Sequence, residues 1–435
     1  MKRTAAAAPD ACDERSGNER SGNERSGGQG QRSAEYRAVA VVSLAHFVNH
    51  FQNFVLPPLF PLLTAQLGIG FVDLGFALTI ANTLSVAAQL PVGFLVDRVG
   101  SQRMLVLALV TSAVAFIGFG LSPSYPRLLL AAALLGLANS VFHPADYAIL
   151  SARIAPARVG RAFSIHTFCG FLGTAVAPVT TLAVAASLGL SFAVIAAGSV
   201  ALIAALPLIL VRGVDNLVSA SHPHATSSAT RLGLTSVLTP TIVALTGFFA
   251  LLSLSGSGIS NFSVAALTAA FGTPLSTATL ALTAYLSAQA LGVLAGGFIA
   301  DMTRRHAEVA AVGYGINACI VLAIGTIELS AAPLVAAMSC AGLLGGLIMP
   351  SRDMLVRAAA PPGAVGRTFG IVTSGFNIGG MIGPLMFGLI MDRGAPRWVF
   401  GASVIVMILT ASVALIGDRW SARRQAMLRA LAAAE

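Results

Sequence analysis

Long apolar segments alternate with short polar ones along most of this chain. An apolar run of about 20 residues is long enough to cross a bilayer as an α-helix. Six such runs are predicted in the first half, near 38–63, 74–96, 104–121, 127–150, 162–186 and 190–211. Six more are predicted in the second half, near 239–264, 276–300, 308–328, 332–356, 368–391 and 398–417. The pattern therefore predicts an all-α polytopic membrane protein with twelve transmembrane helices.

The two halves repeat each other in sequence. Residues 136–178 align without a gap to residues 342–384, so that Pro144 falls on Pro350 and Pro178 on Pro384. Internal duplication of this kind is typical of secondary transporters. We therefore expect two pseudo-symmetric six-helix bundles.

The duplication and the polar segments together predict the domain boundaries. The bundles are expected at 38–211 and 239–417, joined by a cytoplasmic linker at 212–238. Residues 1–37 are polar and repetitive, which predicts a disordered cytoplasmic tail, and 418–435 form a second cytoplasmic tail. No apolar core with a small-residue cleavage site precedes the first span, so a cleaved signal peptide is not expected.

Composition agrees with the membrane interpretation. Only 10% of the residues are charged and 56% are hydrophobic, whereas soluble domains carry about 25% charged residues. Most of the arginines between the predicted spans lie in short loops on one side, with Arg127, Arg393 and Arg397 as the exceptions on the other. By the positive-inside rule, this distribution places both termini in the cytoplasm. We therefore expect a multi-pass protein of the inner (plasma) membrane that does not bind nucleic acid. The four cysteines form no CxxC pair, so neither a metal site nor a disulfide framework is expected.

The loop after the second predicted span carries a motif, Gly93-Phe-Leu-Val-Asp97-Arg98-Val-Gly100-Ser-Gln-Arg103. It resembles the G-x-x-x-D-R-x-G-x-x-R signature of the major facilitator superfamily, and a degenerate copy ends at Asp301 in the second half. The resemblance implies a twelve-helix carrier in which Asp97 caps the eleventh helix near Gly366 and stabilises the outward-open form. An exposed turn with a solvated ion pair is the alternative interpretation.

A second motif lies in the fifth span and recurs in the eleventh. It resembles the glycine–proline motif that the superfamily associates with antiporters. Helix packing alone also favours small residues at this spacing, so the motif is compatible with a purely structural role. Its residues are Gly170, Gly173 and Pro178 in the first copy and Gly379, Gly383 and Pro384 in the second.

Polar residues inside the predicted spans carry the candidate chemistry. Four of them share one face of the first span because they recur at helical spacing, namely His46, Asn49, His50 and Asn53. The fourth span adds Asn139, His143 and Asp146, and the fifth adds His166. Polar side chains are costly in lipid unless they face a cavity or a partner, and histidine titrates near neutrality. The group therefore predicts a substrate or proton pathway, although Asp146 and His166 could also be structural anchors that pair with a nearby arginine.

These spans also resemble one branch of the superfamily, the fosmidomycin-resistance-type exporters, which carry H-x-x-N-D and F-H-P-E in the first and fourth spans. His46, Asn49, His143 and Pro144 match, but position 50 is His instead of Asp and position 145 is Ala instead of Glu. In the second half, Arg352 and Asp353 lie in the stretch that corresponds to residues 145–147. They are interpreted either as ligands of a charged substrate or as an ion pair at the membrane rim.

The sequence thus predicts a secondary active transporter of a small organic solute, working by alternating access as a proton-coupled exporter. Proton-coupled uptake of a metabolite such as an organic acid or a sugar is the alternative within transport. A non-transporting membrane sensor is the alternative of another class. No nucleophile–base pair, metal cluster or phosphate-binding loop is apparent, so enzyme activity and a cofactor are not expected. The expected partners are substrate, protons and the bilayer, with the protein acting as a monomer.

Overall fold

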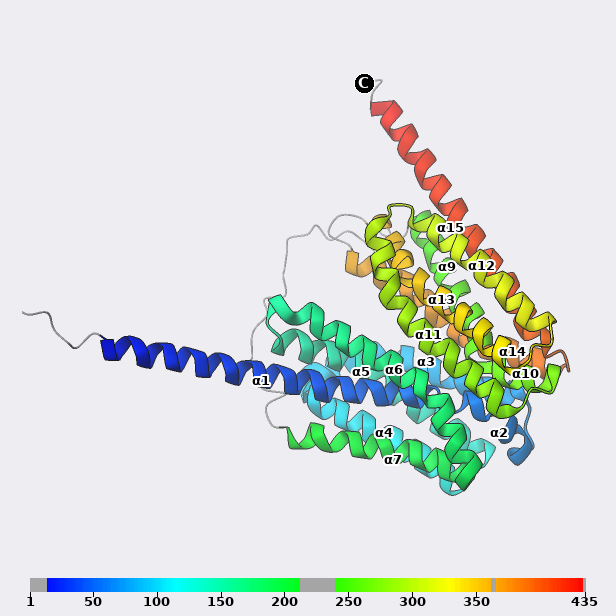
Figure 1. The fold of residues 1–435 in the computed structure, drawn as a ribbon, viewed down its shortest axis with the longest axis horizontal. Helices are drawn as coiled ribbons and strands as arrows, with labels where there is room; N and C mark the ends of the chain where they lie inside the picture. Colours follow the sequence, from blue (N-terminus) through cyan, green and yellow to red (C-terminus); the bar gives the residue numbers. More distant parts are fainter. Residues whose placement is uncertain (1–13, 212–238, 361–364, 433–435) are drawn as a thin grey trace, which may run out of the picture.

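The computed structural model describes residues 14–211, 239–360 and 365–432 (Figure 1). The predicted linker at 212–238 lies outside the described residues. Within them, twelve helical segments are long and apolar enough to span a membrane, and they coincide with the twelve predicted spans. These spans confirm the predicted fold class. Apolar runs of this length form helices because a helix satisfies all its backbone hydrogen bonds within the segment.

The N-terminal half contains six spans, of which the first is broken. Its elements are α1 (Glu14–Asn53), η1 (Pro57–Leu59), α2 (Phe60–Leu67), α3 (Phe71–Val99), α4 (Ser101–Leu121), α5 (Tyr125–Arg153), α6 (Pro156–Leu188) and α7 (Leu190–Leu210). The C-terminal half repeats the arrangement. Its elements are α9 (Pro240–Ser257), η2 (Gly258–Phe262), α10 (Ser263–Phe271), α11 (Leu275–Met302), α12 (His306–Thr326), α13 (Ala331–Ala359), α14 (Val365–Asp392) and α15 (Arg397–Ala432).

The helices at both ends of the chain extend beyond the expected bundle boundaries. α1 begins at Glu14, ahead of the first predicted span. α15 likewise continues to Ala432 through most of the expected C-terminal tail. One tertiary contact fixes α1 just before the apolar run: the Glu35 carboxylate pairs with Arg158 on α6 through two hydrogen bonds of 2.8 Å. The polar residues therefore continue the helix that the apolar span has already formed.

The first span of each half is interrupted at a matching place. α1 ends at Asn53, ahead of Pro57 and Pro58, because proline cannot donate the backbone hydrogen bond that helix continuation requires. In the second half, a π-helical turn, η2, separates α9 from α10. Helix breaks of this kind at corresponding positions are a feature of repeat-built transporters.

The two halves are joined near one end of the molecule, and their helices diverge toward the other end (Figure 1). The contact is formed mainly by α3 with α14 and by α6 with α11. The α3–α14 contact is close: a Cβ at Gly75 would overlap the carbonyl oxygen of Pro384, and one at Gly388 would lie 2.6 Å from the carbonyl oxygen of Phe71. Thr79 and Asn82 each donate a side-chain hydrogen bond of 2.8 Å to the α14 backbone.

The outer surface of the helices is apolar, as a lipid-facing surface must be. Large hydrophobic side chains such as Leu90, Phe298 and Met302 are 74%, 73% and 87% exposed. The interior is filled by alanine, leucine and phenylalanine side chains in the described part of both halves. Among the described residues, the buried acidic and histidine side chains lie on α1, α5 and α6, and three of them, His46, Asp146 and His166, form the candidate site.

Candidate functional site

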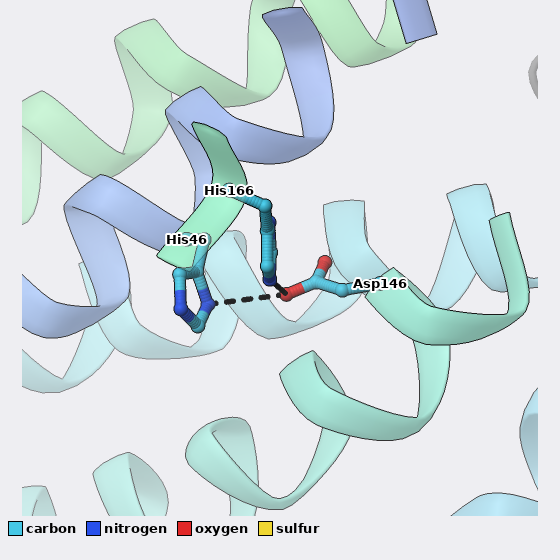
Figure 2. Close-up of side chains that lie close together, drawn as sticks. All are labelled: His46, Asp146 and His166. Atoms are coloured by element: carbon cyan, nitrogen blue, oxygen red, sulfur yellow. Dashed lines mark ion pairs between the residues drawn. The ribbon is translucent and has the colours of Figure 1, made fainter. Parts of the chain in front are cut away.

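Three helices of the N-terminal half place His46, Asp146 and His166 against one another (Figure 2). Nδ1 of His46 on α1 lies 3.2 Å from Oδ2 of Asp146 on α5. Nε2 of His166 on α6 lies 3.5 Å from the same oxygen. The two imidazole rings stack, with their centroids 3.8 Å apart. The structure thus brings together three residues that are far apart in the sequence, two histidines on one carboxylate oxygen.

This cluster is closed to solvent. The side chains of His46, Asp146 and His166 are 5%, 0% and 1% exposed. The distances are those of ion pairs, but the two Asp146 oxygens, His46 Nδ1 and both His166 nitrogens have no partner at hydrogen-bonding geometry in the part of the chain that the structure describes. Buried polar atoms are nearly always hydrogen-bonded, so exceptions of this kind indicate a functional role or a bound species.

Two further histidines surround the cluster. The ring of His50 lies 4.4 Å from that of His46, and the ring of His143 lies 5.6 Å from it. His50 is held by the Thr174 hydroxyl, 3.2 Å from its Nδ1. His143 is exposed, unlike the three central residues. The exposed His143 therefore lies next to the buried group.

The predicted asparagines form a separate hydrogen-bonded group. Asn49 donates to Oδ1 of Asn139 at 2.9 Å, and Asn53 approaches the same oxygen at 3.4 Å. Asn139 in turn donates to the Ser85 hydroxyl at 2.8 Å. This group connects α1, α5 and α3, so the polar face of α1 serves two purposes: its histidines meet Asp146 and its asparagines meet Asn139.

The glycines of the fifth span make room for the cluster. A Cβ at Gly170 would lie 2.7 Å from two ring atoms of His46 and 3.2 Å from His50. A Cβ at Gly173 would overlap the carbonyl oxygen of Phe47. Hence α6 can approach α1 closely enough to bring His166 onto His46. In the second half, Gly379 and Gly383 approach α9 in the same way, at Ala250 and Ser257.

The C-terminal half holds a cation at a comparable position. Arg352 on α13 hydrogen-bonds through Nε to Asp353 at 3.0 Å, and its side chain is 12% exposed. Its guanidinium carbon lies 5.0 Å from the ring centroid of Phe249 on α9 and 4.9 Å from that of Phe376 on α14. A cation over an aromatic face is stabilised by the ring quadrupole. All these partners lie in the C-terminal half, so Arg352 and Asp353 form a group separate from the His46 cluster.

The loop motif lies away from both groups. Asp97, Arg98 and Arg103 are exposed near the junction of α3 and α4, and Asp301 is exposed at the corresponding end of α11. Gly100 has φ +101°, a conformation that favours glycine, so it sets the turn between the helices. Asp97 and Gly93 line a surface hollow of about 240 Å³ beside Pro144. The chain just before the α14 start, 361–364, is outside the described residues, and so is the side chain of residue 366.

A helix-capping carboxylate that sequence reasoning missed lies at the opposite end of α3. Asp392, the last residue of α14, accepts hydrogen bonds from the backbone amides of Phe71 and Val72. Its position after the eleventh span could have been noticed, because it ends a helix whose duplicated partner lacks a carboxylate there. Ser85, Thr174 and the Phe249–Phe376 pair were also missed, since single hydroxyls and aromatic residues in a span are usually structural.

The histidine–aspartate cluster also has a spacing compatible with a metal ion. One ligand atom from each of His46, Asp146 and His166 lies within 4.8 Å of the other two. Imidazole and carboxylate are the ligands that zinc uses in proteins. The arrangement thus permits two uses, a shared proton or a bound cation.

Comparison with a family model decides the assignment of the chain. The model for the Major Facilitator Superfamily matches residues 42–257 and 243–430, which together cover most of the sequence. The chain belongs to this superfamily. The resemblance carried by the loop motif and the duplication is confirmed, and the superfamily's members among the relatives are transporters.

The relatives include one protein from the branch that the sequence suggested. The chain is 24% identical to the fosmidomycin resistance protein of Escherichia coli over 384 residues, covering 85% of this chain and 90% of that protein. It is 24% identical to the uncharacterized MFS-type transporter YttB of Bacillus subtilis, covering 88% and 96%. A shorter match, 27% identical over 154 residues, covers 37% of the B. subtilis MFS-type transporter YfnC.

Solved structures of the superfamily share the fold at low sequence identity. A bacterial homologue of the human lysosomal transporter Spinster, in an inward-facing and occupied conformation, matches with a TM-score of 0.75 at 15% identity, covering 88% of this chain and 96% of that one. The nucleoside transporter NupG matches with a TM-score of 0.70 at 12% identity, covering 87% and 99%. The chain therefore shares its fold with these two solved structures.

Proposed function

We propose that this protein exports a small organic solute across the plasma membrane in exchange for protons. The observation that carries the proposal is the closed cluster in which His46 and His166 meet one oxygen of Asp146. The superfamily assignment supplies solute transport, and the 24% identity to a fosmidomycin resistance protein favours export. The cluster supplies a reason for proton coupling.

The electrostatics of burial explain how such a cluster couples. A lone carboxylate in a low-dielectric interior is costly, and a shared proton or an imidazolium partner removes most of that cost. Asp146 is 0% exposed between two imidazoles. The closed cluster is therefore stable while it holds a proton, and loss of that proton destabilises it unless the surrounding helices move apart. Proton release is thereby tied to a change in the helices that enclose it, α1, α5 and α6.

Alternating access provides that change. Arginine-rich loops favour a cytoplasmic location for the end at which the halves diverge, so the conformation described here is proposed to be inward-facing. The exposed His143 beside the cluster is then the route by which a proton reaches the cytoplasm. In the opposite conformation, the halves close at this end, and Asp97 is proposed to cap the start of α14.

The test uses inverted membrane vesicles with an imposed proton gradient that is followed by a pH-sensitive dye. Candidate drugs, organic acids and sugars are added in turn. Collapse of the gradient by a compound through the wild-type protein identifies antiport and the substrate together. Asp146→Asn should abolish this collapse while exchange of labelled substrate continues, because substrate binding does not need the proton.

A matched variant separates coupling from general damage. Glu328→Gln makes the same chemical change at an exposed loop carboxylate and should behave as wild type. Unchanged gradient collapse in Asp146→Asn would contradict the coupling role. Compounds that drive proton movement only in right-side-out vesicles would instead establish proton-coupled uptake.

A further inference from the structure

Arg352 occupies the position in the C-terminal half that Asp146 occupies in the N-terminal half. In the gap-free alignment of 136–178 with 342–384, Asp146 falls on Arg352. The contacts of the neighbouring helices agree: Gly173 approaches the carbonyl of Phe47, and its counterpart Gly379 approaches the carbonyl of Ala250. By this correspondence, Phe249 takes the place of His46.

The same location in the two halves therefore holds opposite charges in different surroundings. Asp146 is closed in by imidazoles, whereas Arg352 lies against two phenylalanine rings at 5.0 and 4.9 Å. Phe249 and Phe376 also contact each other, with their ring centroids 4.8 Å apart. These rings fix the plane of the guanidinium and leave its edge available, because cation–π contact uses the face and hydrogen bonding uses the edge.

Some hydrogen-bond donors of Arg352 make no hydrogen bond to the described residues. Its Nε donates to Asp353, but its two terminal nitrogens have no hydrogen-bond partner in the ranges that the structure describes. The side chain is 12% exposed, while Asp353 is 48% exposed, so the carboxylate lies toward solvent and the guanidinium inward. A guanidinium edge that is fixed in place matches the two oxygens of a carboxylate or phosphate.

Other polar groups lie farther along the same face of α13. Gly345 is seven residues before Arg352, which is two helical turns or about 10 Å. The place where a Cβ of Gly345 would be is approached by Gln289 at 3.7 Å, Asn317 at 3.8 Å and the Tyr285 hydroxyl at 4.0 Å. Oδ1 of Asn317, a residue that is 1% exposed, has no hydrogen-bond partner among the described residues. An acceptor without a donor at this place suits a hydroxyl or amide group of a ligand.

We infer that Arg352 is the anchor of an organic oxyanion, a solute that carries a carboxylate or phosphate group and a body with hydrogen-bond donors. The inference rests on the proposed function only in that a solute is transported. It adds the chemical class of the solute and assigns separate tasks to the two halves. Asp146 handles the proton, and Arg352 holds the anion.

Calorimetric titration of the purified protein in nanodiscs of phosphatidylcholine tests the inference without any proton gradient. Benzoate and phenyl phosphate serve as anionic probes, and benzamide serves as the neutral counterpart of benzoate. The wild type should bind the anions at least about tenfold more tightly than benzamide, and Arg352→Gln should remove that preference. Equal binding of anions and benzamide by the wild type would overturn the inference.

Two variants keep the result independent of folding defects. Asp353→Asn removes the carboxylate that competes for the guanidinium, so it should tighten anion binding, an effect that damage cannot mimic. Arg352→Lys keeps the charge but loses the planar edge, and it should bind the anions more weakly than the wild type does. Anion binding that is unchanged in Asp353→Asn and in both Arg352 variants would contradict the site.

A lipid headgroup is another source of the same chemistry. Repeating the titration in nanodiscs with phosphatidylglycerol distinguishes the two sources. If the free solute is the ligand, benzoate affinity stays the same, whereas competition by the anionic lipid at Arg352 would assign the site to lipid and overturn the transport role. Gradient collapse in vesicles without selectivity for anions would leave the exporter intact and refute only this inference.

Discussion

Asp392 and Phe71 connect the two halves of the protein through a charged cap on a helix end. The carboxylate of Asp392, at the end of α14, accepts the backbone amide of Phe71 at 2.7 Å and the next amide at 2.8 Å. Phe71 is the first residue of α3, so the negative charge lies at the positive end of that helix. Gly70 leaves room for this carboxylate, because a Cβ there would lie 2.6 Å from Oδ2 of Asp392.

We expect Asp392→Asn to shift the protein away from the conformation described here. A carboxylate at a helix N-terminus contributes about 0.3–2 kcal/mol, which corresponds to a population shift of up to about thirtyfold. Spin labels at two exposed positions on the diverging ends, Ala152→Cys and Ala358→Cys, report the separation of α5 and α13. The variant should populate the shorter of the two label distances more than wild type does.

Asp97→Asn makes the same chemical change at the opposite end of α3, where the side chain is exposed. If Asp97 caps the α14 start in the other conformation, this variant should move the label distances in the opposite direction. A shift in the same direction for both variants would contradict the capping role of Asp392.

Gly75→Ala should prevent the close approach of α3 and α14. The added methyl group would overlap the backbone carbonyl of Pro384, and backbone cannot move aside as a flexible side chain can. Overpacking of this kind costs about 1–3 kcal/mol, so transport should fall by about fivefold or more while the protein still inserts in the membrane. Gly118→Ala is the matched control on α4, where a Cβ has open space, and wild-type transport is expected there.

Gly170→Ala should uncouple transport although no titratable residue is replaced. The new Cβ would lie 2.7 Å from the His46 ring and force that ring away from Asp146. Proton-driven accumulation should therefore drop, as we also expect for Asp146→Asn, while substrate exchange persists. Gly160→Ala on the same helix meets no neighbouring atom and should retain coupling. Retained proton coupling in Gly170→Ala would show that the position of His46 is not critical.

Removal of divalent metal should leave transport unchanged. The spacing of His46, Asp146 and His166 permits a metal ion, but the proposed role uses only a proton. Vesicles prepared with a membrane-permeable chelator should show the same substrate-dependent collapse of the gradient as untreated ones. Loss of transport on chelation, restored by zinc, would assign the cluster to a metal instead.

The sequence predicted the twelve spans and the family because those depend on long-range regularities. Apolar length determines a span, and an alignment of 43 residues without a gap reveals the repeat. The grouping of His46 with His166 and Asp146 was also accessible, since polar residues at similar depth in neighbouring spans tend to meet. Their exact partners were not, as the alternative of an arginine partner for Asp146 illustrates.

Contacts between the halves were beyond the reach of sequence reasoning. Nothing local to Asp392 distinguishes a helix cap from a solvated loop carboxylate, because its partners are 320 and 321 residues away. The stacking of Arg352 on Phe249 and Phe376 depends in the same way on three separate helices. Such pairs follow from the packing of complete bundles, which no short motif encodes.

The interruption of the first span in each half gives each half a point at which its first helix can bend. Phe60 follows the break in the first half, Phe262 ends the π-helical turn in the second, and their rings meet with centroids 5.4 Å apart. His46 lies seven residues before Asn53, the last residue of α1, which is about 10 Å along the helix axis. A tilt of about 5° at this break would then move His46 by about 1 Å, by the same rise per residue. We therefore expect a small tilt of α1 at this break to change the distance between His46 and Asp146.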